Sequence, residues 1–477
     1  MSDVADVLTP PSAHPLARLF DPGTVRARCA AIERSVLNNV SSHFTLDKIH
    51  LAAAADRVAA LTLRRFPDLR IPVHSRWRHF EAGGVDRKAE LDARLDGRAV
   101  AEAARARFDL VVLSVLLDAG AGGRWSYTER DDVDAAALPV QRHRSDELLA
   151  LLDQAAKGTG AADPGAGTDV APASAAALPV ARSGIGAVHA RSEGLAVASL
   201  RAFLAGVFSA SKDDPLRADA GTLKLVDAAV LRGVFQVTPA NPMVGLEGRA
   251  GLISRLGDAV AAEAARSGLQ ARPGLLYDQL TTGGTRSEVS ASEVLAAVLR
   301  LLSPIFTSGS RVQGLPAGDV WPHRWAGAAV GGGGSDPTTD GWVPFHKLSQ
   351  WLSYSLLEPL QWAGVRVSGV DALTGLPEYR NGGLFIDCGV IVPRDPRDLS
   401  RSWKPGDEFI VEWRALTVCL LDELAMLVRQ RLGRTAAELP LACILEGGTW
   451  AAGRELAAEL RSDGAPPLKI DSDGTVF

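Results

Sequence analysis

The sequence predicts a mainly α-helical protein with a small β element. Three observations lead to this class. Apolar residues recur at spacings of three and four along several stretches, most of these stretches end at a proline or a glycine, and only one region carries short β-rich apolar triplets. The 477 residues exceed the roughly 100–200 of a typical domain, so the chain can build one large core. We interpret residues 1–477 as a single domain.

The first predicted helix spans residues 45–66. Its apolar residues recur every three or four positions from Leu51 to Leu61, Thr45 can cap its start, and Pro67 follows its end. The same spacing predicts further helices, in chain order, at residues 107–120, 193–208, 246–256, 292–302, 347–359 and 416–432. Pro359 is expected to break the fifth of these, and Gly433 to cap the last.

One region, GGLFIDCGVIVP at residues 382–393, departs from this pattern. The apolar triplets LFI and VIV flank Asp387, Cys388 and Gly389. A three-residue loop that ends in glycine suits a tight turn, so we expect a β-hairpin here.

Two segments are expected to be flexible. Residues 157–177 are rich in Gly, Pro and Ala and lack large apolar side chains, so burial cannot offset their ordering entropy. We interpret them as a low-complexity surface insertion. Residues 331–334 are four consecutive glycines, which predict a flexible joint.

Charge and composition exclude several classes of protein. Lys and Arg total 51 against 56 Asp and Glu, a net charge of −5, whereas general DNA binders and anionic-membrane binders concentrate cationic surface. No segment approaches the ~20 apolar residues of a membrane-spanning helix, and the N-terminus lacks a secretory signal pattern. We expect a cytoplasmic protein with neither nucleic-acid nor membrane partners. The four cysteines form no CxxC pair, which favours reduced thiols over a metal site.

The segment HSRWRHFEAGG, residues 74–84, is the first candidate for a functional site. Arg76 and Arg78 offer planar donor forks for a phosphate or carboxylate, and His74 or His79 can bond a sugar hydroxyl. The alternative is a solvated loop that Trp77 anchors to the core.

Two further clusters lie where helices or turns are expected. His346, Lys347 and Gln350 begin the predicted helix at 347–359, where free amide donors favour anions. The alternative is the ordinary polarity of a helix start. Arg380 and Asn381 precede the predicted hairpin, and a purely structural ion pair or turn is equally compatible with them.

Two glutamates are candidates for acid–base chemistry. Glu412 and Arg414 precede a buried helix and would share a side if that stretch were extended, although such a pair is more often structural. Glu446 interrupts an apolar run and is followed by Gly447 and Gly448. We expect its carboxylate to be partly desolvated, which raises the pKa, and the glycines to let a ligand or the backbone approach closely.

Six motifs together resemble the uracil-catabolism protein family of fungi and bacteria: HSRWRHFEAGG, NPMVGLEGRAGLISRLG, VWPHRWAG, DGWVPFHKLSQWLSYSLLEP, TGLPEYRNGGLFIDCGV and LEGGTW. That family is associated with the processing of ribosylurea. The resemblance implies a single catalytic domain that hydrolyses the N-glycosidic bond between ribose and urea, with no cofactor and no metal. The resemblance does not decide whether the sugar of the substrate carries a 5-phosphate.

The stretches RFDLVVLSVLLDAGAGGRWSY, LEGRAGLISRLGDAV and EFIVEWRAL are similar to the queuosine salvage glycohydrolases. This similarity implies a helical, DNA-glycosylase-like domain. It assigns the catalytic carboxylate to Glu446, four residues before Trp450, and a ligand-binding histidine to His74 or His79. A recognition Asp of those proteins falls near Phe345, so that contact is missing here.

The chemistry of this reaction and the clusters described above supply the remaining candidate residues. The proton donors to the departing urea would be Asp387, Glu412 or a protonated histidine. Arg76, Arg78 and Lys347 would suit a phosphate. The other substrate-binding residues would be Trp77, His346, Gln350, Arg380, Asn381, Arg414 and Trp450.

Two alternatives to the hydrolase stay open. One is an amidohydrolase that acts on a ureido intermediate, which should need a metal cluster or a nucleophile–base arrangement. The other is a non-catalytic binding protein of the same pathway. The expected partner is a small-molecule ribosyl substrate, and a homo-oligomer is compatible with the sequence.

Overall fold

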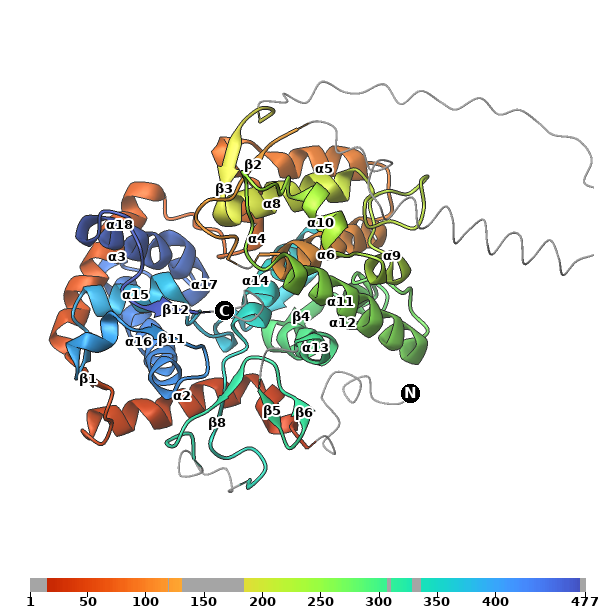
Figure 1. Cartoon of the computed structure of the whole chain (residues 1–477). Coiled ribbons are helices and arrows are strands. Elements are labelled where there is room, and N and C mark those ends of the chain that lie inside the picture. Colours follow the sequence, from red (N-terminus) through yellow and green to blue (C-terminus); the bar gives the residue numbers. More distant parts are fainter. Residues whose placement is uncertain (1–14, 119, 131–183, 307–309, 328–335, 472–477) are drawn as a thin grey trace, which may run out of the picture.

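The computed structural model describes residues 15–118, 120–130, 184–306, 310–327 and 336–471. Helices dominate this part of the chain, which confirms the mainly α class (Figure 1). The insertion predicted at residues 157–177 and the joint predicted at 331–334 lie outside the described residues.

The helices follow in chain order: α2 (Pro22–Leu37), α3 (Leu51–Arg65), α4 (Arg76–Phe80), α5 (Arg87–Leu95), α6 (Val100–Leu116), α8 (Arg191–Leu204), α9 (Ala220–Lys224), α10 (Ala228–Val234), α11 (Leu246–Ser267), α12 (Leu275–Thr281), α13 (Ala291–Leu302), α14 (Lys347–Trp362), α15 (Tyr379–Asp387), α16 (Glu408–Leu432), α17 (Leu441–Ile444) and α18 (Trp450–Leu460). A π-helical turn, η8 (Leu445–Thr449), joins α17 to α18. Short 3-10 helices are η1 (Ala17–Phe20), η2 (Lys48–His50), η3 (Ala82–Gly84), η5 (Ser303–Ile305), η6 (Val370–Ala372) and η7 (Pro396–Leu399).

The strands are two or three residues long and form two-stranded pairs. The antiparallel pairs are β1 (Phe44–Leu46) with β10 (Ile391–Pro393), β2 (Ser126–Thr128) with β3 (Val188–Ala190), β5 (Arg311–Val312) with β6 (Leu315–Pro316), and β7 (Val320–Pro322) with β8 (Trp342–Pro344). The parallel pairs are β4 (Glu288–Ser290) with β9 (Arg366–Ser368) and β11 (Ser402–Trp403) with β12 (Lys469–Ile470). Most pairs join segments that are far apart in the sequence. They connect loops to one another and do not build a larger β-sheet.

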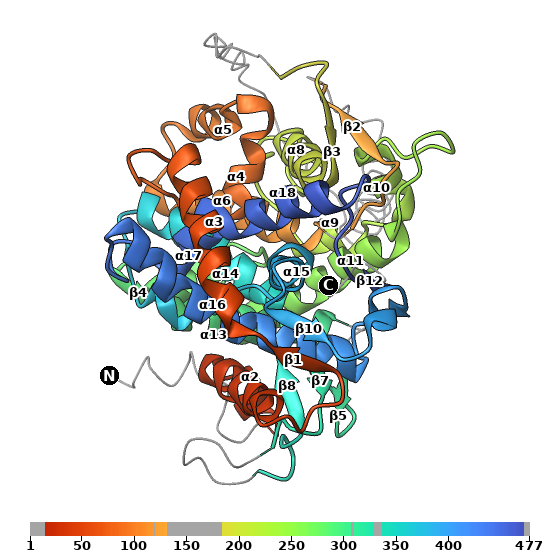
Figure 2. The same ribbon diagram turned by 90° about the vertical axis from the view of Figure 1, so that its left-hand side faces the viewer.

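The helices pack in two groups on either side of α14 (Figure 1). One group holds α2, α3 and α15 to α18, in which α16 packs on α2 and α3, and α15 packs on α18. The view in Figure 2 shows α3 beside α16 and α18. The other group holds α5, α6 and α8 to α13, and α14 packs on both α6 and α13. One large hydrophobic cluster, from Leu16 to Leu468, runs through both groups.

Most predicted helices are confirmed, with shifted ends. The predicted helix 45–66 begins only at Leu51, because Thr45 lies in β1 and pairs with Val392. Its proposed cap by Thr45 is therefore wrong. α16 ends at Gly433 in the left-handed conformation, with φ 62°, as the sequence predicts.

Pro359 does not break α14, contrary to expectation. A proline at this position cannot donate to the carbonyl of Ser355, four residues earlier. The indole Nε1 of Trp77 donates to that carbonyl instead, at 3.0 Å. The orphaned acceptor is thus satisfied from α4, and the helix runs on to Trp362.

The predicted hairpin at residues 382–393 is wrong as well. Residues 379–387 form α15, and only residues 391–393 form a strand, which pairs with β1. Glu378 caps the helix by accepting from the backbone N–H groups of Arg380 and Asn381. Leu384, Phe385 and Ile386 are all buried, because α15 packs against both α16 and α18. A helix enclosed in this way reads as a short continuous apolar run.

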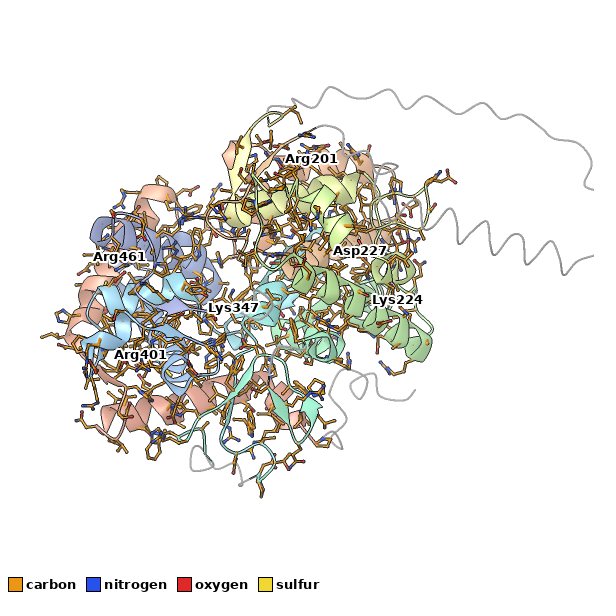
Figure 3. All side chains as sticks on the ribbon, in the orientation of Figure 1. Arg201, Lys224, Asp227, Lys347, Arg401 and Arg461 are labelled. Carbon is orange, nitrogen blue, oxygen red and sulfur yellow. The ribbon has the colours of Figure 1, made fainter. Side chains whose placement is uncertain are left out.

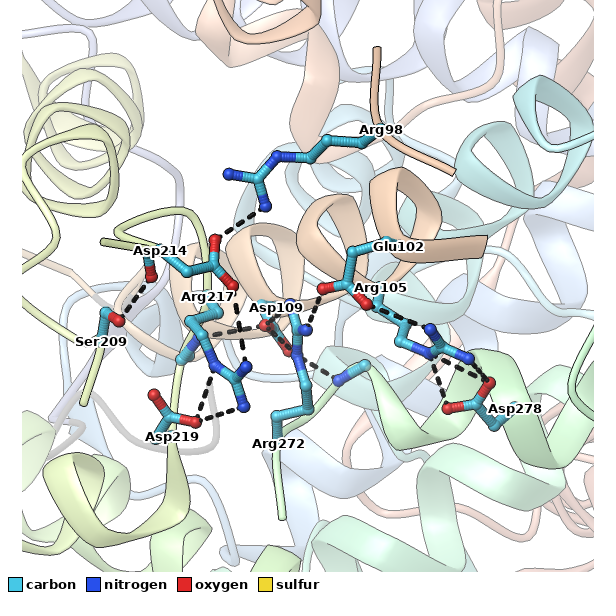
Figure 4. Close-up of polar contacts among 12 residues, drawn as sticks. Arg98, Glu102, Arg105, Asp109, Ser209, Asp214, Arg217, Asp219, Arg272 and Asp278 are labelled. Atoms are coloured by element: carbon cyan, nitrogen blue, oxygen red, sulfur yellow. Dashed lines mark hydrogen bonds and ion pairs between the residues drawn. The ribbon is translucent and has the colours of Figure 1, made fainter. Parts of the chain in front are cut away.

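Buried ion pairs fasten the loops of the second helix group to α6 and α8. Figure 4 shows Arg272 on Asp109, with Nη2 to Oδ2 at 2.6 Å and both side chains fully buried. Glu129, also fully buried, accepts from Arg87 Nε at 2.8 Å and from Arg201 Nε at 2.9 Å. This second cluster fixes the end of β2 against α5 and α8.

No helix of the described segments is both long and apolar enough to cross a membrane. The four cysteines are free thiols; Cys29 and Cys443 are buried, and Cys388 and Cys419 are partly buried.

Candidate functional site

A cavity of about 630 Å³ lies where the two helix groups meet. This volume is within the roughly 300–1,000 Å³ of small-molecule sites. Its lining comes from six parts of the chain: His74 and His79; Asp118 and Gly120–Gly123; Arg191, Ser192 and Glu193; Lys347 and Trp351; Leu376, Glu378, Tyr379 and Arg380; and Trp450, Arg454, Asp463–Pro466 and Ile470. In Figure 3, Lys347 lies between the two groups.

Four aromatic rings form one wall of the cavity. The ring of His79 lies edge-on to Trp351, with centroids 5.6 Å apart, and His74 lies 6.4 Å from Trp351. Trp450 is 6.5 Å from each histidine. Both predicted histidines therefore face the cavity together, and the two tryptophans hold their rings in place.

Glu446 lies behind this wall and contacts His74. Its Oε2 is 2.9 Å from His74 Nδ1, and its Oε1 accepts from Arg65 Nη2 at 3.0 Å. A carboxylate only accepts hydrogen bonds, so Nδ1 carries the proton and Nε2 is the ring nitrogen left for a ligand. Glu446 is thus placed to orient His74 and is not itself among the residues that line the cavity.

The pKa of Glu446 is lowered, whereas the sequence led us to expect a raised value. Burial acts to raise this pKa, but the hydrogen bond from His74 and the charges of His74 and Arg65 outweigh it. The neighbouring glycines serve backbone packing and not the ligand. A Cβ at Gly448 would lie 2.7 Å from the Val58 carbonyl oxygen, so η8 can approach α3 only without side chains there.

His79 is neutral at pH 7. Burial lowers the pKa of its imidazole well below 6.5, and the positive charges of Arg76 and His74 lower it further. The two histidines therefore differ in their surroundings: Nδ1 of His74 contacts the Glu446 carboxylate, and His79 lies beside the charge of Arg76.

Asp118 brings a carboxylate to the opposite side of the rings. Its Oδ2 lies 3.0 Å from Arg76 Nη1, and its side chain is only 5% exposed. Arg76 Cζ also lies 5.7 Å from the Trp351 ring, so it connects Asp118 to the aromatic wall.

Three buried polar atoms of the lining have no hydrogen-bond partner among the described residues. They are Asp118 Oδ1, Trp351 Nε1 and His79 Nδ1. Burial without a partner costs about 1–3 kcal/mol for each group. Because the residues that carry these atoms all line one cavity, a ligand there is a candidate partner for them.

Cations surround the rest of the cavity. Arg191 begins α8, Lys347 begins α14, and Arg380 lies in the first turn of α15. Arg454 lies one turn after Trp450 on α18, with its Cζ 4.8 Å from that ring. Each of these side chains lines the cavity, so it can accommodate an anionic group.

Comparison with known proteins places the sequence in a family. The model of the family described as a protein of unknown function (DUF1688) matches residues 18–152 and 163–477. The chain belongs to the DUF1688 family. Protein urg3 of Schizosaccharomyces pombe is 32% identical over 474 residues, which cover 98% of this chain and all of the relative. Uracil catabolism protein 4 of Lachancea kluyveri is 34% identical over 463 residues, 91% of this chain and 92% of the relative.

These matches bear out the resemblance to a uracil-catabolism family seen in the motifs. The similarity to the queuosine salvage glycohydrolases, and the DNA-glycosylase-like form of the domain, stay predictions.

Of the site residues predicted for this DUF1688 chain, five line the cavity: His74, His79, Lys347, Arg380 and Trp450. Arg76 and Glu446 lie directly behind it, bound to Asp118 and His74. The 74–84 segment is therefore not a solvated loop, because α4 buries Arg76 and Trp77.

Asp387 and Glu412 lie outside the cavity. Arg461 holds both carboxylate oxygens of Asp387, with Nη1 to Oδ1 at 2.9 Å. Glu412 is buried inside α16, where Ser41 Oγ donates to it at 2.5 Å. The expectation of an extended stretch around Glu412 is wrong, since α16 begins at Glu408.

The remaining predicted residues have structural contacts away from the cavity lining. Arg414 pairs through both terminal nitrogens with Asp319, at 2.7 Å each. Arg78 pairs with Glu358, and His346 Nε2 lies 2.7 Å from the Leu19 carbonyl oxygen. The others are Trp77 on Ser355, Gln350 on Thr374 and Asn381 on Leu376.

Sequence reasoning missed Asp118, Arg191, Trp351 and Arg454. Arg191 has φ 56°, a left-handed backbone that an arginine rarely adopts and that no sequence pattern reveals. Arg454 follows Trp450 by one helical turn, and that spacing was the signal that could have found it.

Among the described residues, no group of three or more His, Cys, Asp or Glu side chains is placed to hold a metal ion.

Proposed function

We propose that this DUF1688 chain acts in uracil catabolism by hydrolysing the N-glycosidic bond of ribosylurea or of ribosylurea 5-phosphate, with release of urea. The name of the Lachancea kluyveri relative, uracil catabolism protein 4, supports the pathway. The observation that carries the reaction is that one cavity holds an oriented histidine and a carboxylate whose Oδ1 has no partner among the described residues. Both His74, bound to Glu446, and Asp118 line one cavity of about 630 Å³.

The reaction needs an acid on the leaving group. The C1–N bond breaks with its electron pair on nitrogen, and urea is a poor leaving group unless that nitrogen gains a proton. His74 is the acid in this proposal. The Glu446 carboxylate accepts from Nδ1 and fixes the ring, so Nε2 is the atom that delivers the proton.

The reaction also needs a negative charge at the sugar. Positive charge develops on C1 and the ring oxygen as the bond breaks, and a nearby carboxylate stabilises it. Asp118 takes this role, because its Oδ1 is buried and without a partner among the described residues. The same oxygen accepts a proton from the attacking water. Water thus adds OH to C1 and leaves its proton on Asp118, while His74 gives one proton to urea. Proton exchange with solvent then returns Asp118 and His74 to their starting states.

Glu446 therefore changes its role with respect to the sequence prediction. It acts through His74 and is a positioning residue in this proposal. Trp351 Nε1 and His79 Nδ1 are the remaining unsatisfied polar atoms of the lining. A ureido group offers a carbonyl acceptor for the N–H of Trp351 Nε1 and N–H donors for His79 Nδ1.

The test is urea release by the purified full-length protein from ribosylurea and from ribosylurea 5-phosphate. The native chain should release urea and the free sugar from at least one of them. Asp118→Asn should lower kcat by roughly 10²-fold or more, the usual size of an acid–base contribution. Glu33→Gln is the matched control, because Glu33 pairs with Lys48 away from the cavity, and it should keep native turnover.

Product analysis separates this proposal from the two alternatives. An amidohydrolase would release ammonia before urea. A binding protein would release neither product yet retain the ligand. Absence of urea release from both substrates by a normally folded protein would rule out the hydrolase.

A further inference from the structure

Three arginines from three separate helices line the cavity. Arg191 begins α8, Arg380 lies at the start of α15, and Arg454 lies on α18. We call these three residues the arginine rim. All three side chains line this one cavity, so their guanidinium groups are available to the same ligand.

The donors of the arginine rim are only partly used. Arg380 Nη1 donates to the Gly464 carbonyl at 3.0 Å, and Arg454 Nη1 lies 3.5 Å from Glu193 Oε1. The guanidinium of Arg191 has no hydrogen bond or ion pair with any described residue, and neither has the ammonium of Lys347. A guanidinium carries five N–H donors, so most donors of the rim remain available.

The carboxylates of the lining are engaged elsewhere. Glu378 caps α15 with both oxygens, and Asp463 accepts from the Ala465 N–H. Asp118 is bound to Arg76, and Glu193 is the distant partner of Arg454. The first turn of α8 adds backbone amides, because its N-cap residue, Ala190, has no side chain that could accept from them.

We propose that the arginine rim binds a phosphate ester, so that the sugar on which this chain acts carries a 5-phosphate. The inference rests on the proposed function for the identity of the sugar. Guanidinium forks match the oxygens of a phosphate in pairs, and three of them with the amides of a helix start form a site for a dianion. A ribosyl group between the rim and the aromatic wall then presents C1 to His74 and Asp118.

The experiment is calorimetric titration of the full-length protein with ribose 5-phosphate, ribose and inorganic phosphate. Ribose 5-phosphate should bind at least about tenfold more tightly than either of the others, since charge-assisted hydrogen bonds add to the sugar contacts. Arg191→Gln and Arg454→Gln should each weaken ribose 5-phosphate roughly tenfold and leave ribose unchanged. Arg191 is exposed and 40% of the Arg454 side chain is exposed, so these variants should fold.

Arg324→Gln is the matched control, because this exposed arginine pairs with Glu408 away from the cavity; it should bind ribose 5-phosphate like the native chain. Equal binding of ribose and ribose 5-phosphate would overturn the inference. So would tight binding of inorganic phosphate with no gain from the sugar, which would assign the rim to the free ion.

The urea assay separates this inference from the function on which it rests. Urea release with equal kcat/KM for ribosylurea and its 5-phosphate would keep the hydrolase and overturn the phosphate site. Rim-dependent binding of ribose 5-phosphate without urea release from either substrate would keep the site and overturn the hydrolase.

Discussion

The Nδ1 atom of His74 lies 2.9 Å from Oε2 of Glu446, and the other oxygen of that carboxylate is held by Arg65. His74 lies just before α4, and Glu446 lies in η8, the π-helical turn before α18. Two segments far apart in the sequence therefore fix the orientation of one imidazole ring. Its orientation depends on the carboxylate and on the packing that carries the carboxylate there.

Glu446→Gln should abolish most turnover without unfolding the protein. Glutamine cannot stabilise the imidazolium of His74, and it can favour the wrong tautomer, so we expect a loss of roughly 10²-fold or more in kcat. KM should change little, because Glu446 does not line the cavity. Glu455→Gln, which alters only an exposed pair with Arg64, should retain native kcat. An equal loss of kcat in Glu446→Gln and Glu455→Gln would contradict the role of Glu446 in orienting His74.

The pH dependence of the native chain should report the same carboxylate. The pKa of Glu446 is lowered from 4.5, so the folded state holds the ionised form more firmly than the unfolded chain does. Its contribution to stability is complete above about pH 4.5 and is lost as pH falls below that value. The melting temperatures of the native chain and of Glu446→Gln, measured as a function of pH, should therefore differ near neutral pH and converge at low pH. Parallel curves would contradict this.

His79 should stay neutral through the physiological range. Burial and the charges of Arg76 and His74 lower its pKa well below 6.5, so its ring shifts in NMR spectra should not change between pH 8 and pH 6.5. Since the unfolded chain takes up this proton near 6.5, the group favours folding above that pH and disfavours it as pH falls further. His79→Gln identifies the signal. A titration midpoint near 6.5 would show that the ring is less buried than it is here.

Glu129→Gln should destabilise the fold by about 3–5 kcal/mol, because it leaves Arg87 buried without its counter-charge and removes one of the two carboxylates that pair with Arg201. Burial acts to raise the pKa of Glu129, but the hydrogen bonds from the two arginines lower it to about 2. Its stabilisation is therefore complete above about pH 4.5 and is lost as pH falls through about 2. Denaturant titration at pH 7 measures the loss, and Glu288→Gln, in an exposed pair with Arg366, should cost at most about 1 kcal/mol.

Gly448→Ala should disturb both stability and the site. The new methyl would lie 2.7 Å from the Val58 carbonyl oxygen and 2.7 Å from Thr62 Oγ1 on α3, so η8 must move away at a cost of about 1–3 kcal/mol. The shift displaces Glu446 from His74 and should lower kcat as well. Gly221→Ala, where no atom lies within 4 Å of the added Cβ, is the control, and thermal melting with the urea assay reads both effects. An unchanged melting temperature in Gly448→Ala would contradict the packing.

Long amphipathic helices were predictable from the sequence, because their apolar spacing records a single buried face. α13 is an example, with a capping box between Ser290 and Glu293. α15 was not, because it is buried on most sides and short, and its cap, Glu378, is an uncommon one. Pro359 misled for a related reason. The Ser355 carbonyl that Pro359 leaves without a donor accepts a hydrogen bond from the indole of Trp77, and Trp77 lies 359 − 77 = 282 positions before Pro359 in the sequence.

The candidate site was predictable only in part. His74, His79 and Glu446 stood out because polar side chains interrupted apolar surroundings. Asp118 and Arg191 did not, since each becomes part of the cavity only through tertiary contacts between segments that no local pattern connects.

The ladder between β2 and β3 pairs Ser126 with Ala190 and Thr128 with Val188. Glu129 continues this pairing, because its N–H donates to the Ala187 carbonyl oxygen at 2.9 Å, so the described residues on the two sides of positions 131–183 lie next to each other. Loop closure costs grow only slowly with length, so homologues should tolerate insertions and deletions between residues 131 and 183 while Glu129, Asp118 and Arg191 keep their places. Gene-length differences within the family should concentrate there, and a protease cut or a fused tag in this interval should leave catalysis untouched.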